Sequence, residues 1–72
     1  MRVLIKSHGC YSIFYDKMFG YKRYYVSWRN GTLETYSGLW YNEEQVIKLV
    51  EDRLLWIYFI FMTVLFYQHK HN

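Results

Sequence analysis

The 72-residue sequence contains no proline and only one cysteine, Cys10. A single cysteine cannot form an internal disulfide, which excludes the small disulfide-rich secreted scaffolds. The first six residues have only three consecutive apolar side chains before a lysine, so we expect no secretory signal there. Aromatic residues, in contrast, make up 24% of the chain, which excludes a disordered protein. The length allows one small domain.

Motifs that carry chemistry are also missing. His8 and Cys10 are the only base and nucleophile close in sequence, and no acidic or amide residue can be assigned to orient them. His69 and His71 are the only pair with metal-ligand spacing, and they follow a predicted helix whose end lies far from any fixed point. We therefore expect no enzyme, no metal site and no cofactor.

Charge is mild and spread along the chain, except in one stretch that has none. The formal net charge is +3, less than a dedicated nucleic-acid binder carries. Residues 54–67 are fourteen consecutive residues without a charge. Leaving half of them in water forfeits about 10 kcal/mol at roughly 1.5–3 kcal/mol each, comparable with the stability of a small domain. Something must cover this stretch.

Three agents could cover residues 54–67: the rest of the chain, a partner protein or lipid. A helix that is apolar on all sides cannot be the surface helix of a soluble monomer, because a neighbouring element covers only one side. A strand would need covering on both faces. Fourteen helical residues rise about 21 Å, short of the hydrocarbon core of about 30 Å. However, Arg53 and Lys70 can reach outward, and Trp56 and Tyr67 stand where interface aromatics belong.

The first 41 residues predict a small antiparallel sheet. Residues 2–6 and 11–15 are β-prone and are separated by turn-like residues. Residues 16–20 are typical of a loop, in which Met18 and Phe19 could reach the core.

The clearest local signal is a hairpin over residues 22–37. Asn30-Gly31 supplies the two positive-φ positions of a two-residue type I′ turn. This turn sets a register in which Trp28 opposes Leu33 and Tyr25 opposes Tyr36. The predicted buried face is Tyr24, Val26, Trp28 and Leu33, and the predicted outer face carries Arg23, Tyr25, Arg29 and Tyr36.

A helix start is predicted at Asn42. Gln45 three residues later resembles a capping box, and Glu43 and Glu44 favour the positive end of the helix dipole. We expect a helix over 42–67, amphipathic over 42–53 and wholly apolar over 54–67, with a polar tail at 68–72.

Two short motifs resemble those of known families. Tyr25-Val26-Ser27-Trp28 resembles the last four positions of the RNP1 motif of the RRM family, which implies base stacking on single-stranded RNA. Lys22 and Arg23 stand where that motif has glycine and an aromatic residue, and the family's β-α-β-β-α-β order is missing. Trp28 with Gly38-Leu39-Trp40 resembles the W…GLW signature of the claudin family, without its paired cysteines or preceding transmembrane helix. We assign the chain to neither family.

The sequence thus predicts an α+β chain, in which an aromatic antiparallel sheet of three or four strands at residues 1–41 precedes one long helix. We interpret it as a non-enzymatic accessory protein, anchored to a membrane by its helix and acting as a subunit or modulator of a larger complex. One alternative is a soluble, cytoplasmic inhibitor or adaptor of the viral type that binds a partner protein or forms a homo-oligomer through the helix. Another is a basic aromatic nucleic-acid-binding module, the least favoured of the three.

Two candidate contact surfaces follow from this interpretation. The outer hairpin face combines tyrosine and arginine, which are enriched at energetic hot spots of interfaces. The apolar helix is the second surface, in contact with lipid or a partner. Its candidate contact residues are Leu54, Leu55, Trp56, Ile57, Phe59, Ile60, Phe61, Val64, Leu65 and Phe66.

Overall fold

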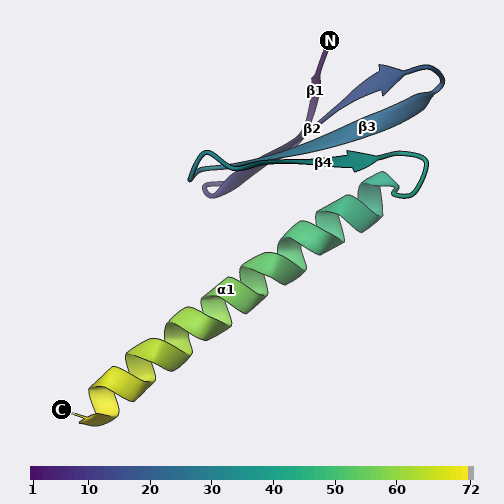
Figure 1. Ribbon diagram of the computed structural model, residues 1–72. Coiled ribbons are helices and arrows are strands. Elements are labelled where there is room, and N and C mark those ends of the chain that lie inside the picture. Colours follow the sequence, from purple (N-terminus) through teal and green to yellow (C-terminus); the bar gives the residue numbers. More distant parts are fainter. Residues whose placement is uncertain (72) are drawn as a thin grey trace.

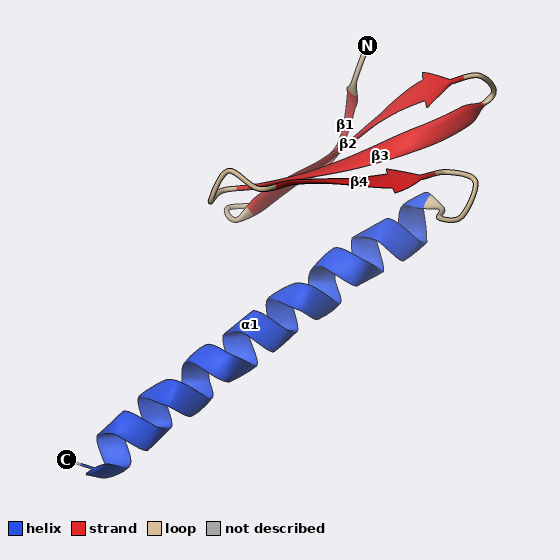
Figure 2. Ribbon diagram, in the orientation of Figure 1, coloured by secondary structure: helices blue, strands red, loops and turns tan. Residues whose placement is uncertain are grey.

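The computed structural model describes the backbone of residues 1–71 and the side chains of residues 1–67. Four antiparallel strands form one sheet in the order β1-β2-β3-β4, and a single helix follows them (Figure 1, Figure 2). The predicted α+β architecture is confirmed. The elements are β1 (Val3–Ser7), β2 (Tyr11–Met18), β3 (Tyr21–Trp28), β4 (Leu33–Ser37) and α1 (Glu43–His71).

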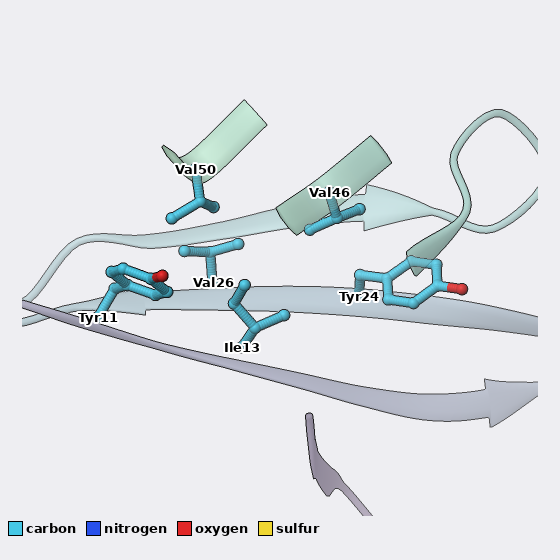
Figure 3. Close-up of a cluster of buried hydrophobic side chains, with 6 residues drawn as sticks. All are labelled: Tyr11, Ile13, Tyr24, Val26, Val46 and Val50. Carbon is cyan, nitrogen blue, oxygen red and sulfur yellow. The ribbon is translucent and has the colours of Figure 1, made fainter. Parts of the chain in front are cut away.

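The helix α1 covers one face of the sheet with its first turns and then extends beyond the sheet (Figure 1). Val46 and Val50 lie one turn apart and point at Ile13 and Val26 in the central strands (Figure 3). Ile13, Val26 and Val46 are fully buried. Tyr11 and Tyr24 complete the buried cluster, and Leu54 is the last helix residue that packs against it.

The turn between β2 and β3 differs from the expected loop at residues 16–20. The two strands pair without a break from Tyr11↔Trp28 to Met18↔Tyr21, which leaves only Phe19 and Gly20 for the turn. Both residues have positive φ, 50° and 86°, as a type I′ turn requires. The expectation that Phe19 reaches the core is wrong, because its side chain is 94% exposed at the tip.

The turn between β3 and β4 is longer by one residue than the predicted two-residue turn. The Trp28 amide donates to the Thr32 carbonyl at 2.8 Å, and the Gly31 amide donates to the Trp28 carbonyl at 3.0 Å. Of the two turn positions expected at positive φ, only Gly31 has it, at 95°. The Asn30 side chain instead accepts a hydrogen bond from the Thr32 amide at 2.9 Å, which stabilises a three-residue loop.

The extra loop residue shifts the register of β4 and turns its side chains to the opposite faces. Ser27 opposes Leu33 and Tyr24 opposes Tyr36, so the predicted Trp28–Leu33 pair is wrong. Leu33 lies on the outer face and is 52% exposed. The other three residues of the predicted buried face, Tyr24, Val26 and Trp28, do pack in or against the buried cluster.

The predicted helix start is confirmed. The Gln45 amide donates to Asn42 Oδ1 at 2.8 Å, and the Asn42 amide donates to Gln45 Oε1 at 2.9 Å. These two bonds form a complete capping box, which satisfies backbone donors at the helix start. The helical backbone continues to His71 rather than ending at Tyr67, and the side chains of the expected tail at 68–72 lie outside the described part.

Among the residues described, no helix is both long enough and apolar enough to cross a membrane. The expectation of a transmembrane helix is therefore not supported. The apolar segment is only fourteen residues long, and polar or charged residues flank it at 51–53 and at 68–71.

Directly after β4, the backbone at Gly38 approaches that of β3 so closely that a side chain would not fit. Its amide donates to the Lys22 carbonyl at 2.6 Å, and an added Cβ would collide with the Lys22 backbone. We expect Gly38→Ala to lower the free energy of unfolding, measured by urea denaturation, by about 1–3 kcal/mol, as overpacking does. Gly9→Ala is the matched control. No atom lies within 4 Å of a Cβ added at Gly9, so its stability should stay the same or rise by up to about 1 kcal/mol. Equal unfolding midpoints for the two variants would contradict this account.

Candidate functional site

The part of α1 at residues 55–67, named here the distal helix, is exposed on all sides. Its large apolar side chains are between 46% exposed, at Leu65, and 70% exposed, at Phe66. Exposure does not fall every third or fourth residue, as it would on a helix with one covered face. Nine of the ten predicted helix contact residues are therefore exposed together, and only Leu54 is half-buried against the sheet.

The distal helix has few polar groups that could bond to water or to another molecule. Thr63 is the one residue with a small hydroxyl, and its Oγ1 donates to the Phe59 carbonyl at 2.8 Å within the helix. The Trp56 and Phe59 rings meet edge to face at 6.4 Å. An open apolar hollow of about 530 Å³ lies along one side of the distal helix and is lined by Leu55, Trp56, Tyr58, Phe59 and Met62. This part of the protein therefore suits a hydrophobic neighbour.

A group of four side chains holds the helix to the sheet where the distal helix begins; we call it the Glu34 clasp. Trp28 Nε1 donates to Glu34 Oε1 at 2.8 Å, and the Tyr36 hydroxyl donates to Glu34 Oε2 at 2.6 Å. The Arg53 guanidinium also donates to Glu34 Oε1 and lies 5.6 Å from the centre of the Trp28 ring. The clasp joins β3, β4 and α1 at one carboxylate.

The clasp changes the acidity of Glu34. Burial alone would raise the pKa of this carboxyl, but the hydrogen bonds from Tyr36, Arg53 and Trp28, with the charge of Arg53, outweigh burial and lower the pKa. The charged form of Glu34 is therefore favoured in the folded protein. A second ion pair, between Lys6 Nζ and Glu51 Oε1 at 3.0 Å, is about half exposed and adds little stability.

The four residues predicted for the outer hairpin face do not form one surface. Arg23 and Tyr25 lie on the sheet face away from α1, but Tyr36 lies on the helix side and Arg29 lies in the β3–β4 turn. Tyr25 is only 7% exposed, and the Arg2 guanidinium lies 4.1 Å from the centre of its ring. Its hydroxyl donates to Asp16 Oδ2 at 3.0 Å. The binding role of these residues stays a prediction.

Sequence reasoning missed the role of Glu34. In the predicted register Glu34 opposed Ser27 on the outer face, whereas in the structure it opposes Val26 on the helix side. The sequence does contain a signal for the observed register. A three-residue loop with glycine in the third position, here residues 29–31, is a common hairpin connection and pairs Ser27 with Leu33.

No three His, Cys, Asp or Glu residues in the described chain lie together in a way that could hold a metal ion. Cys10 is an exposed free thiol. The side chains of His69 and His71 lie outside the described residues.

The lowered pKa of Glu34 predicts an acid-sensitive fold. Its contribution to stability is complete above the pKa of an unfolded glutamate, about 4.3, and is lost as pH falls through the lower folded-state pKa. We expect the wild-type Tm to fall below about pH 4, and Glu34→Gln to lower Tm at neutral pH and to flatten its fall in acid.

Asp52→Asn is the control for loss of one carboxylate, because Asp52 is exposed on α1 and lies away from both ends of the helix. This variant should keep the wild-type acid dependence. An acid profile of Glu34→Gln parallel to that of the wild type would contradict the assignment.

No protein family, curated protein or solved structure matches the chain.

Proposed function

We propose that the protein is a non-enzymatic accessory protein that attaches to a membrane by inserting its distal helix into lipid. The sheet is then a head at the membrane surface, which acts as a subunit or modulator of a larger complex. The observation that carries the proposal is the exposure of large apolar side chains on every side of the distal helix.

Lipid fits this exposure better than a single protein groove. A groove or a second helix covers one stripe of a helix, whereas acyl chains surround it. Trp56 and Tyr58 near the start of the segment and Tyr67 at its end match the preference of these residues for membrane interfaces.

The apolar segment is too short to cross a bilayer. Residues 54–67 rise about 21 Å, whereas the hydrocarbon core is about 30 Å thick, so we propose insertion without crossing. Polar residues flank both ends, with Arg53 before the segment and Lys70 after it. Because α1 runs unbroken from the head into the segment, we place Arg53 at the headgroup layer and the apolar residues below it.

A second candidate function is an interaction protein whose distal helix is covered by protein, either a partner or further copies of this chain. The observation that favours it is the one-sided apolar hollow lined by Leu55, Trp56, Tyr58, Phe59 and Met62, which offers a seat for another helix. Burial of this hollow in an oligomer would need no lipid.

Vesicle flotation tests the first proposal. The wild-type chain should float with phosphatidylcholine vesicles, and Phe61→Lys should weaken binding about 100-fold, because a lysine deep in hydrocarbon costs about 2.5–3.5 kcal/mol. Phe61 is 60% exposed and does not pack against the buried cluster, so the head should keep its unfolding midpoint. Phe19→Lys, at the exposed β2–β3 tip, is the matched control and should float like the wild type.

Light scattering without lipid separates the two candidates. A stable oligomer that fails to float, and that Leu55→Lys dissociates, would support the covered-helix function and overturn membrane attachment. A monodisperse monomer that binds no vesicles would overturn both.

A further inference from the structure

A second hollow lies at the end of the sheet where the distal helix departs. It is formed between the β1–β2 turn and the β3–β4 turn, which lie at the same end of the sheet (Figure 1). Its volume is about 160 Å³, smaller than the pockets that enclose drug-sized ligands. The residues that line it are His8, Gly9, Cys10, Tyr11, Ser12, Ser27, Trp28 and Arg29.

Backbone bonds and ring packing fix the walls of this hollow. The Arg29 amide donates to the Cys10 carbonyl at 2.9 Å, which ties the two turns together. Within the β1–β2 turn, the His8 amide donates to the Tyr11 carbonyl at 2.8 Å. The His8 ring stacks on Tyr11 at 5.5 Å, and Tyr11 in turn meets Trp28 at 5.8 Å. The hollow is therefore built into the fold.

The polar groups at the hollow suit an anion. The Arg29 side chain is exposed and has no carboxylate partner among the described residues, and the lining includes no Asp or Glu. Ser12 and Ser27 are cross-strand partners in β2 and β3, and the Ser12 hydroxyl shares a hydrogen bond with the Ser7 hydroxyl at 3.3 Å, whereas Ser27 is exposed. A guanidinium with nearby hydroxyl groups is the donor set that recognises phosphate oxygens.

The hollow lies close to the point where the distal helix begins, because Trp28 belongs to both places. Trp28 is one of the lining residues, and its ring lies 5.6 Å from the guanidinium of Arg53, the last charged residue before the apolar segment. When residues 54–67 enter lipid, the hollow is held close to the layer of headgroups. Asp52 is exposed on the helix, and helical spacing turns it away from the sheet-packing residues Val50 and Leu54.

We propose that this hollow binds the phosphate of an anionic phospholipid headgroup, with Arg29 as the main ligand and the inserted distal helix bringing the two together. This inference rests on the proposed membrane attachment. It adds a preference for one class of lipid, which the apolar helix alone would not provide.

The test compares flotation on phosphatidylcholine vesicles with flotation on vesicles that also contain phosphatidic acid. We expect the anionic lipid to tighten binding of the wild type about fivefold, the effect of one cation near an anionic surface. Arg29→Gln should remove this gain and leave binding to phosphatidylcholine unchanged. Lys48→Gln is the matched control for charge, because Lys48 is exposed on α1 away from the hollow. It should keep the gain.

Each outcome points to a different conclusion. Floating on phosphatidylcholine without any gain from phosphatidic acid, or an equal loss in Arg29→Gln and Lys48→Gln, overturns the headgroup site and leaves membrane attachment standing. Failure to float on either vesicle overturns membrane attachment and the site with it. A titration with inorganic phosphate at constant ionic strength, followed by the amide resonances of His8 and Arg29, separates the two sources. Shifts with free phosphate but no gain on anionic vesicles would replace the lipid headgroup with a soluble phosphate.

Discussion

The helix is held to the sheet by a buried apolar contact, in which Val46 and Val50 meet Ile13 and Val26. Leu54, one turn further along α1, extends this contact. The carboxylate of Glu34 adds a polar contact at the same end. Trp28 and Tyr36 donate to it from within the sheet, and Arg53 donates to it from the helix. Together the apolar and the polar contact define the direction in which the helix leaves the sheet.

Features that depend on neighbouring residues could be predicted from the sequence. Asn42 and Gln45 form the expected capping box, because both partners lie within one helical turn and need no distant contact. The order of a sheet followed by a helix was predictable for the same reason, since alternating residues and a helix cap are local signals. The apolar character of residues 54–67 was also visible in the sequence, because the segment contains no charged residue.

Strand register could not be predicted in the same way. Asn30-Gly31 is compatible with a two-residue turn and with a three-residue loop, and the hydrogen bond from Thr32 to the Asn30 side chain favours the longer one. One residue of difference exchanged the faces of β4, so Glu34 and Tyr36 moved from the solvent side to the helix side. The type I′ geometry instead occurs at Phe19-Gly20, where an aromatic residue gives no local signal for positive φ. The Glu34 clasp was missed because of the one-residue shift in the register of β4.

The unbroken course of α1 has a mechanical consequence. Between Glu43 and His71 the helix contains neither glycine nor proline, the residues at which helices bend sharply. It starts beneath the sheet, is clasped at Arg53 and runs on as one rod in a molecule 57 Å long and only 20 Å by 15 Å across. Because this rod has no hinge, a change in the tilt of its far end changes the tilt of the sheet as well. The orientation of the sheet therefore depends on what surrounds the far end of the helix.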